Sequence, residues 1–410
     1  MPADHARVLG ARDDSALGAN PPCEARGATG SLLHLITPEY PPQQGGVSGY
    51  TYRVASELAT RGIRVHVWCR TGGPAPESEG VTVHNDLGTF TRKDLRAVDA
   101  KLNSFPAPRH LVVQWVPHGY GYRSMNVEFC RWLRRRATFS GDRIDLMVHE
   151  PYLEFRWNSP GQSAAALIHR WMTMLLLSST RQVWMSIPAW EKRLRPYALG
   201  RNVHFDWLPV PSNIPVSADP QKVADLRSRY AAGRPMLIGH FGTYGDLIAH
   251  PLKGILSALA EQGSEAAILL MGHGSEEFLR RFEREEPRLK VFACGGLPAE
   301  ELSHHLSACD LMIQPYPDGV STRRGSFMAG LSHGRAIVTT IGHLSEPMWR
   351  DSAAVAAVPV GDVSGFVESI RRLTSDAAAR DRLGRAAREL YLERFDLPHV
   401  ADALLQAPAM

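Results

Sequence analysis

The chain reads Leu-Met-Ile-Gln-Pro-Tyr-Pro-Asp-Gly-Val-Ser-Thr-Arg-Arg-Gly-Ser over residues 311–326, and residues 327–334 continue with the spacing of a helix. A short apolar strand thus leads into a loop of small, hydroxyl and basic residues that precedes a helix. Units of strand, loop and helix build parallel α/β sheets. A loop that ends at a helix N-terminus also offers free backbone N–H groups to an anion. Residues 311–334 therefore predict a parallel sheet with a phosphate-bearing ligand at its edge.

Two consecutive arginines, Arg323 and Arg324, add fixed positive charge to this loop. At about 4 Å and an effective dielectric constant of about 20, one guanidinium group attracts a phosphate charge by about 4 kcal/mol. The dipole of the following helix contributes only about 0.3–1 kcal/mol. The arginines therefore dominate the predicted anion site. The alternative interpretation is a solvated turn with two surface arginines.

Short apolar runs recur along the chain, separated by segments of helical length. Before the proline-rich segment 208–215 they lie at residues 32–36, 65–69, 111–116, 146–149 and 183–186. After it they lie at residues 237–241, 267–271, 290–293, 311–314 and 336–340. This alternation is typical of helix-covered parallel sheets. The predicted fold class is α/β, with two doubly wound Rossmann-like domains that face each other across a ligand-binding cleft.

The domain boundaries follow from length and from prolines. A chain of 410 residues exceeds the size at which one hydrophobic core stops growing, so two domains are expected. Prolines 209, 211 and 215 are incompatible with a helix and with a central strand, and the boundary is placed there. The predicted segments are a flexible tail (1–30), an N-terminal domain (31–210), a C-terminal domain (211–392) and a C-terminal helix that packs back on the N-terminal domain (393–410).

Composition narrows the class of protein. The 46 basic and 42 acidic residues lack the basic excess of a dedicated nucleic-acid binder, and they leave anionic small ligands or a membrane surface open. Five scattered cysteines contain no close pair of the kind that metal sites use, which favours a reducing compartment. No apolar run approaches the ~20 residues of a membrane span, and the first 30 residues lack an apolar signal core. We expect a cytoplasmic protein.

Motifs at the ends of several predicted strands, taken together in their order, resemble family 4 glycosyltransferases of the two-domain GT-B fold. They are residues 41–47 (Pro-Pro-Gln-Gln-Gly-Gly-Val), 208–213 (Leu-Pro-Val-Pro-Ser-Asn), 239–242 (Gly-His-Phe-Gly) with Lys253-Gly254, 271–274 (Met-Gly-His-Gly) and 309–315 (Cys-Asp-Leu-Met-Ile-Gln-Pro). The resemblance covers the chain from Ser31 to about Phe395. It implies transfer of a sugar from a nucleotide diphosphate donor, usually with retention at the anomeric carbon. It implies neither a cofactor nor an obligatory metal.

The resemblance also assigns donor-binding residues. Gly45, Gly46 and Val47 are expected to approach the donor phosphates from the first domain, and Lys253 matches the family's phosphate-binding lysine. In the second domain the expected donor-binding residues are Asp318, Ser321, Thr322, Arg323, Arg324, Gly325 and Ser326. The structural alternatives are a tight glycine turn for residues 45–46 and a solvated side chain for the lysine.

The chain departs from the family at its best-known signature, two glutamates separated by seven residues. Counting from Pro315 places Asp318 and Ser326 at the two positions, whereas counting back from Gly334 places Ser321 and Ala329 there. Neither register keeps the second glutamate, which in the family typically holds the ribose hydroxyls. We infer that donor binding here depends mainly on contacts of the diphosphate with the arginines and hydroxyl groups of this loop.

Catalytic groups are expected near the anomeric carbon. The family often places a histidine after a strand of the first domain, and both His118 and His149 follow such strands. Glu150 is placed to polarise His149 or to accept the proton of the acceptor. The alternative for His118 and His149 is a packing or surface role, because the chain has 17 histidines. The alternative for Glu150 is a strand-end residue that caps a backbone group or forms an ion pair.

Two segments mix arginines with bulky apolar residues, namely 131–136 and 164–172. One interpretation is peripheral contact with anionic lipid. The other is a pair of helices whose apolar sides pack on the sheet while the arginines face water.

The functional prediction is a hexosyltransferase-type enzyme that moves a sugar from a nucleotide diphosphate sugar to a sugar, lipid-linked or small-molecule acceptor in polysaccharide, glycolipid or natural-product biosynthesis. The alternatives are a nucleotide-sugar epimerase or other enzyme of the same fold, and a catalytically silent nucleotide-sugar-binding protein.

Overall fold

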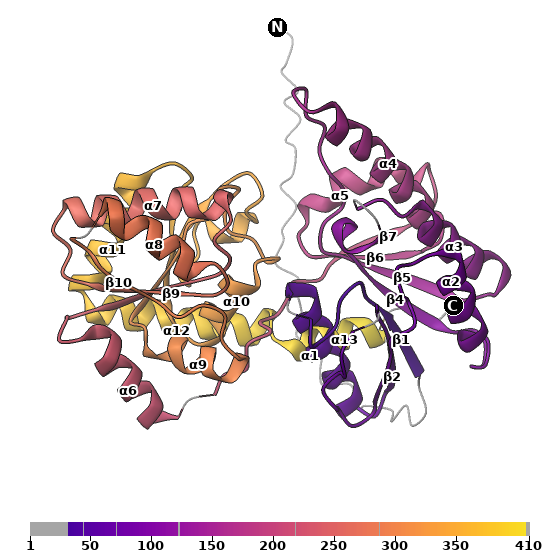
Figure 1. The fold of residues 1–410 in the computed structure, drawn as a ribbon, viewed down its shortest axis with the longest axis horizontal. Coiled ribbons are helices and arrows are strands. Elements are labelled where there is room, and N and C mark those ends of the chain that lie inside the picture. Colours follow the sequence, from indigo (N-terminus) through magenta and orange to yellow (C-terminus); the bar gives the residue numbers. More distant parts are fainter. Residues whose placement is uncertain are drawn as a thin grey trace, which may run out of the picture.

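The computed structural model describes residues 32–43, 45–70, 72–121, 124–217, 219–286 and 288–406. Two parallel β-sheets lie side by side, each with helices on both faces (Figure 1). The predicted α/β class with two doubly wound Rossmann-like domains is confirmed. The tail predicted for residues 1–30 lies outside the described residues.

The N-terminal sheet has seven parallel strands in the order β3-β2-β1-β4-β5-β6-β7. The strands are β1 (Leu32–Ile36), β2 (Arg64–Trp68), β3 (Val81–His84), β4 (His110–Trp115), β5 (Arg143–Val148), β6 (Gln182–Met185) and β7 (His204–Trp207). Its helices are α1 (Gly46–Thr60), α2 (Arg92–Leu102), α3 (Val127–Phe139), α4 (Pro160–Leu177) and α5 (Ala189–Leu194), with short 3₁₀ turns η1 (Pro117–Gly119) and η2 (Arg195–Ala198). The two edge strands, β3 and β7, have no counterpart among the predicted strands.

The C-terminal sheet has six parallel strands in the order β10-β9-β8-β11-β12-β13. The strands are β8 (Leu237–Phe241), β9 (Ala267–Met271), β10 (Lys290–Ala293), β11 (Leu311–Gln314), β12 (Ala336–Ile341) and β13 (Ala356–Pro359). Helices α7 (Asp246–Glu261), α8 (Ser275–Glu285) and α11 (Val363–Ser375) cover one face; α6 (Pro220–Ala231), α9 (Ala299–Ala308), α10 (Gly325–Ser332) and α12 (Ala377–Arg394) cover the other (Figure 1). A 3₁₀ turn, η3 (Pro347–Trp349), precedes β13.

Helix starts are encoded locally by short polar side chains. Asn126 accepts a hydrogen bond from Phe129 N (2.9 Å) at the start of α3, and Asp376 accepts from Ala379 N (2.8 Å) at the start of α12. Each cap satisfies one of the N–H groups that a first helical turn leaves unpaired. Helix α1 differs, because it begins after Gly45 and has no side-chain cap from its N-cap residue.

The last helix, α13 (Leu397–Gln406), crosses from the C-terminal domain and packs on α1 of the N-terminal domain (Figure 1). Leu397, Val400 and Leu404 join the buried cluster that contains Val54 and Leu58 of α1. Arg61 at the end of α1 pairs with Asp402 and donates to the carbonyl of Pro398 (3.1 Å). This helix therefore ties the two domains together, in the same buried cluster as Leu208 and Val210 of the linker.

In each sheet the order in which successive strands are added reverses beside one strand. β1 lies between β2 and β4, and β8 lies between β9 and β11. In open parallel sheets, ligands bind outside the carboxyl ends of the strands at such a switch point. A ligand site is therefore expected at the loops that follow β1, β4, β8 and β11.

Candidate active site

A cavity of about 840 Å³ lies between the two domains, lined by the loops at these strand ends. The N-terminal domain contributes Pro41, Pro42, Gln43, Gly45, Gly46, Ser48, Gly49, Tyr52 and Arg53, and the interdomain linker contributes residues 213–215. The C-terminal domain contributes His240, Phe241, Gly242, Thr243, Gly272, His273, Gly296, Leu297, Gln314, Tyr316 and residues 323–326. These groups follow β1, β8, β9, β10 and β11, so the cavity lies where the topology places a ligand site.

A second cavity, of about 270 Å³, opens on the N-terminal side of the same cleft. Its walls include Val116, His118, His149 and Glu150 of the N-terminal domain. The two cavities share Gly46, Asn213, Arg323, Arg324 and Gly325. The arginine loop therefore stands where the two cavities meet.

Arg323 and Arg324 both form ion pairs with Asp318, and Arg323 also reaches Glu150 across the cleft at 3.2 Å. Their side chains are largely buried, with 13% and 24% exposed. The Nε atom of each is buried and has no hydrogen-bond partner among the described residues. Burial and the neighbouring guanidinium group of Arg324 lower the pKa of Arg323. Two cations thus face two carboxylates, Asp318 and Glu150, and each keeps an unpaired Nε donor that an added anion could accept from.

Aromatic rings hold the two guanidinium groups in place. Arg324 lies over the ring of Tyr316 at 4.8 Å, and Arg323 lies 5.5 Å from the ring of Trp190. The hydroxyl of Tyr316 lies 2.8 Å from Ser326 Oγ in the first turn of α10 and 3.1 Å from Gln314 Oε1. The cavity wall at the start of α10 is therefore a network of hydroxyl and amide groups rather than a carboxylate.

Ser321 and Thr322 are fully buried and do not line either cavity. Thr322 Oγ1 lies 2.8 Å from the carbonyl of Ser186 and 2.6 Å from Glu346 Oε1, and it accepts from Trp207 Nε1 at 3.0 Å. Burial raises the pKa of Glu346. Thr322 therefore fastens the arginine loop to the N-terminal domain, a different place from the phosphate contact predicted for it.

Two other predicted donor residues also lie outside the cavity linings. Lys253 is on α7, half-exposed, and pairs with Glu285 at the end of α8. Asp318 faces the two arginines instead of the open cavity. Gly325 and Ser326, by contrast, line the main cavity as predicted for donor contacts. Ala329, one of the two positions considered for the missing second glutamate, is buried in the core.

The first glycine loop faces the cavity through Gly46, where a Cβ atom would meet no atom within 4 Å. At Gly45 a Cβ atom would fall 2.2 Å from Glu39 Oε1, so a larger residue there would displace the Glu39 carboxylate. Glu39 accepts from Ser48 N at 3.0 Å and so occupies the N-terminus of α1. Val47 lines the smaller cavity. Sequence reasoning missed Glu39, because a lone glutamate after a strand has no signal that separates it from a solvated one.

The predicted catalytic residues meet in the smaller cavity. His118, in η1, is largely exposed and places Nδ1 3.9 Å from Glu150 Oε2. His149 is buried, and its Nε2 lies 2.9 Å from Gln114 Oε1. Burial lowers the pKa of His149 to about 3, so its ring is neutral at physiological pH. The structure thus brings the two histidines and Glu150 together with Arg323.

Residues of the quoted strand-end motifs complete the main cavity. His240 is buried, with Nδ1 2.9 Å from the hydroxyl of Tyr244, and burial lowers its pKa to about 3. Gly272 has φ of 110°, and a Cβ atom there would fall 2.0 Å from the carbonyl oxygen of Gly242. Glycine is therefore required where the loops after β8 and β9 touch.

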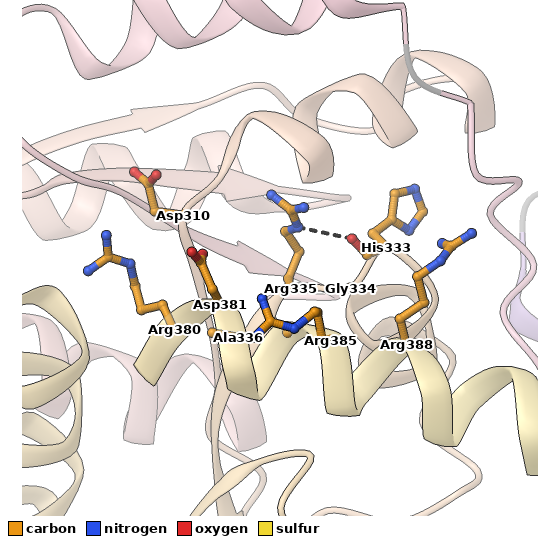
Figure 2. A pocket seen from close by; sticks show the side chains of 10 residues that line it. Asp310, His333, Gly334, Arg335, Ala336, Arg380, Asp381, Arg385 and Arg388 are labelled. Atoms are coloured by element: carbon orange, nitrogen blue, oxygen red, sulfur yellow. Dashed lines mark hydrogen bonds between the residues drawn. The ribbon is translucent and has the colours of Figure 1, made fainter. Parts of the chain in front are cut away.

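Another cavity, of about 340 Å³, lies at the amino ends of β11 and β12 and is lined by arginines (Figure 2). Arg335 donates to the carbonyl of Cys309 (3.0 Å), Arg380 to that of Leu373 (2.6 Å) and Arg388 to that of Ser332 (2.7 Å). These carbonyls belong to the carboxyl ends of α9, α11 and α10. The arginines therefore neutralise converging helix ends, and the cavity has a structural origin.

Within the described residues, no group of three or more histidine, cysteine, aspartate or glutamate side chains is arranged to hold a metal ion. None of the helices in the same part of the chain has the length and apolar character needed to cross a bilayer.

No protein-family model and no curated protein matches the chain. Many solved structures share its fold. Sucrose-phosphate synthase from Thermosynechococcus elongatus is similar over 92% of this chain and 98% of its own, with a TM-score of 0.69 and 17% identity. Anabaena HepE in complex with UDP and glucose gives 0.67 and 12% identity over 91% and 98% of the two chains. WaaG, a glycosyltransferase involved in lipopolysaccharide biosynthesis, gives 0.61 and 15% identity over 92% and 100%. At these identities the likeness establishes the fold, and this chain has the GT-B fold of two facing Rossmann-like domains.

Proposed function

We propose that this protein is a glycosyltransferase that binds a nucleotide diphosphate sugar in the cleft and transfers its sugar to an acceptor on the N-terminal side. The proposal is supported by the position of the two cavities at the facing switch points of a GT-B fold. It is also supported by the described complexes of HepE, a protein of the same fold, with UDP and with UDP-glucose.

The arginine pair carries the proposal. Arg323 and Arg324 stand at the junction of the two cavities, are mostly buried and keep unpartnered Nε donors. A diphosphate at this junction gains two guanidinium contacts and faces the N-terminus of α10 at Gly325. The same groups stabilise the charge that develops on the leaving nucleotide diphosphate as the bond to the anomeric carbon breaks.

The smaller cavity is the proposed acceptor side. Glu150 contacts both Arg323 and His118, so its carboxylate lies between the leaving-group cations and the acceptor space. We assign Glu150 and His118 to orienting the acceptor hydroxyl and receiving its proton. The buried, neutral ring of His149 is assigned to positioning the sugar through its Nδ1 face. Retention at the anomeric carbon remains the prediction from the family resemblance, and the product's anomeric configuration tests it.

Donor binding is tested first by thermal shift against a panel of nucleotide sugars. A ligand present at 100 times its Kd stabilises the native state by about 2.7 kcal/mol, which is visible as a higher melting temperature. In the double variant Arg323→Ala and Arg324→Ala we expect donor affinity to fall at least about tenfold, the equivalent of ~1.4 kcal/mol. Arg385→Ala, an exposed arginine on α12 far from the cleft, is the matched control. Equal donor affinity in the double variant and the control would reject this site.

Transfer is separated from its alternatives by the products. A transferase releases free nucleotide diphosphate faster when an acceptor is added. An epimerase converts the sugar of the donor and releases no free nucleotide diphosphate as product. The altered acidic signature is the observation that favours the third possibility, a silent nucleotide-sugar-binding protein. Donor binding without release under any acceptor would establish that possibility instead.

A further inference from the structure

Five exposed apolar side chains of the N-terminal domain lie on α4 or in the loop that precedes it. Leu153, Phe155 and Trp157 precede the helix, and Leu167 and Trp171 lie on it. Trp157 is fully exposed and Leu167 is 64% exposed. We call these five residues the α4 face. A surface cluster of this size and composition marks an interaction site.

The two residues of the α4 face that belong to the helix, Leu167 and Trp171, lie on one side of an amphipathic helix. Gly161, Ala164, Leu167 and Trp171 recur every three or four residues and are exposed, whereas Ala166, His169, Met172, Leu175 and Leu176 are buried on the opposite side. The buried side of the helix therefore already packs its apolar residues against the domain core. For residues 164–172 the second interpretation of the sequence is an apolar side that packs on the sheet. This explains the buried side of the helix. It leaves the exposed apolar side chains without an apolar partner among the described residues.

Helix length places this face beside the cleft. α4 has 18 residues, about 27 Å at 1.5 Å per residue, whereas its packed neighbour α3 has 13. Both helices connect parallel strands, so their N-terminal ends point to the carboxyl edge of the sheet, the edge that lines the cleft. The early turns of α4 project from the N-terminal domain (Figure 1). Leu153 follows the cleft residue Glu150 by three positions.

The loop that carries Leu153, Phe155 and Trp157 is attached firmly to the helix. His169 Nδ1 accepts from Leu153 N at 3.3 Å, and its Nε2 lies 2.8 Å from the carbonyl of Ser124. Arg170 lies over the rings of Tyr152 (4.5 Å) and Phe155 (3.9 Å). The exposed aromatic rings are thus presented in a defined arrangement.

The charge around the α4 face is positive. Arg131 stacks on Trp171 at 4.9 Å, and the other arginines of the surrounding segments are Arg134, Arg135, Arg156 and Arg170. The acids of these segments, Glu128 and Glu154, are each paired with arginines. Exposed tryptophan, phenylalanine and leucine surrounded by arginine match the interface of an anionic bilayer, in which aromatic rings enter the headgroup region and cations face lipid phosphates.

We propose that the α4 face docks the protein on an anionic lipid surface, with the cleft opening toward that surface. The occupant is the bilayer interface, since the face is apolar at its centre and basic around it. The proposal concerns lipid binding and does not depend on glycosyl transfer, although a docked cleft suits an acceptor that is carried by the membrane.

The test is co-sedimentation of the full chain with vesicles of phosphatidylcholine, alone or with 30% phosphatidylglycerol. We expect at least tenfold stronger binding to the anionic vesicles, and weakening of that binding by added salt. In Phe155→Ala with Trp157→Ala, anionic binding falls at least tenfold. Arg131→Glu with Arg134→Glu gives a similar loss. The matched control is Leu392→Ala, an exposed leucine on α12, which keeps wild-type binding.

Three results would overturn the proposal. They are wild-type protein that stays in the supernatant with anionic vesicles, equal binding to both vesicle types, and α4-face variants that bind like the Leu392→Ala control. Melting curves confirm that each variant is folded. Because donor binding is scored separately in the thermal-shift experiment, failure of lipid docking leaves the proposed transferase function standing, and the reverse also holds.

Discussion

At the scale of single residues, the central feature is the set of charges around Arg323 and Arg324. Their local sequence marks them as an anion site, but the partners come from distant segments. Glu150 is supplied by the other domain and Trp190 by α5. Asp318 occupies the position between the two guanidinium groups that an anionic ligand would contest. The loop therefore combines a predicted cation pair with counter-ions that only folding brings near.

The buried ring of His149 makes stability depend on pH. Its pKa is lowered from 6.5 to about 3 by burial, so between these values the unfolded chain binds a proton that the folded chain does not. The contribution of this group is fully present above pH 6.5 and is lost as pH falls, at up to about 1.4 kcal/mol per pH unit. We expect His149→Gln to flatten the decline in unfolding free energy between pH 6.5 and 5.

Urea unfolding at pH 7.5, 6.0 and 5.0 measures this slope. His118→Gln is the matched control, since its ring is 68% exposed. Identical slopes in His149→Gln and the wild type would contradict the assignment of a neutral, buried ring.

At the scale of elements, close contact between backbones fixes how α12 lies on the C-terminal sheet. Gly384 of α12 touches the turn after α10, and a Cβ atom there would fall 2.3 Å from the carbonyl oxygen of Gly334. Gly334 itself has φ of 61°, which favours glycine. Local sequence does not indicate that another backbone reaches residue 384.

We expect Gly384→Ala to destabilise the protein by about 1–3 kcal/mol, because backbone atoms rather than a flexible side chain must move. Gly254→Ala in α7 is the matched control, since a Cβ atom there meets nothing within 4 Å. That variant should be stabilised by about 0.5–1 kcal/mol, the helix preference for alanine over glycine. Chemical denaturation compares the two, and equal stabilities would show that α12 adjusts freely.

At the scale of the whole molecule, the domains are joined by the linker, by α13, by Leu344 in the loop after β12 and by the loop that holds Thr322. Thr322 is the main fastening in that loop, because its hydroxyl contacts Ser186 and Trp207 and its carbonyl accepts from Val210 N at 3.0 Å. A GT-B cleft needs its two halves in register to hold one ligand between them. Thr322 therefore acts on the site by placing Arg323 rather than by touching the donor.

Thr322→Val keeps the shape and removes the hydroxyl, which leaves Trp207 Nε1 without its acceptor and the carbonyl of Ser186 or Glu346 Oε1 without that donor. A buried polar group left unpaired costs about 1–3 kcal/mol, so we expect a loss of this size together with weaker donor binding. Thr374→Val, where the hydroxyl only contacts Ile370 within α11, is the control. Unfolding free energies and donor titrations measure both effects, and a fully active, equally stable Thr322→Val variant would contradict the fastening role.

Local patterns in the sequence predict much of the fold. The apolar runs at 32–36, 237–241 and 311–314 coincide with β1, β8 and β11, because strands buried on both faces are continuously apolar. The edge strands β3, β7 and β13 were missed. Each has four residues, and β3 and β7 are half-exposed with no apolar run to mark them. Lys253 shows the limit for the site, because a match at one position of a motif does not specify where a long side chain points.

The chain's own pattern of apolar runs, prolines and strand-end loops was enough for the two-domain α/β architecture and for the arginine loop at the cleft, because periodicity and turn chemistry act between near neighbours. The spatial arrangement settled the rest. In the tertiary structure Ser321 and Thr322 are buried, Glu39 accepts a hydrogen bond at the N-terminus of α1, and Glu150 forms an ion pair with Arg323. Those contacts join segments far apart in sequence, and their energies depend on burial and on relative orientation, which local patterns do not encode.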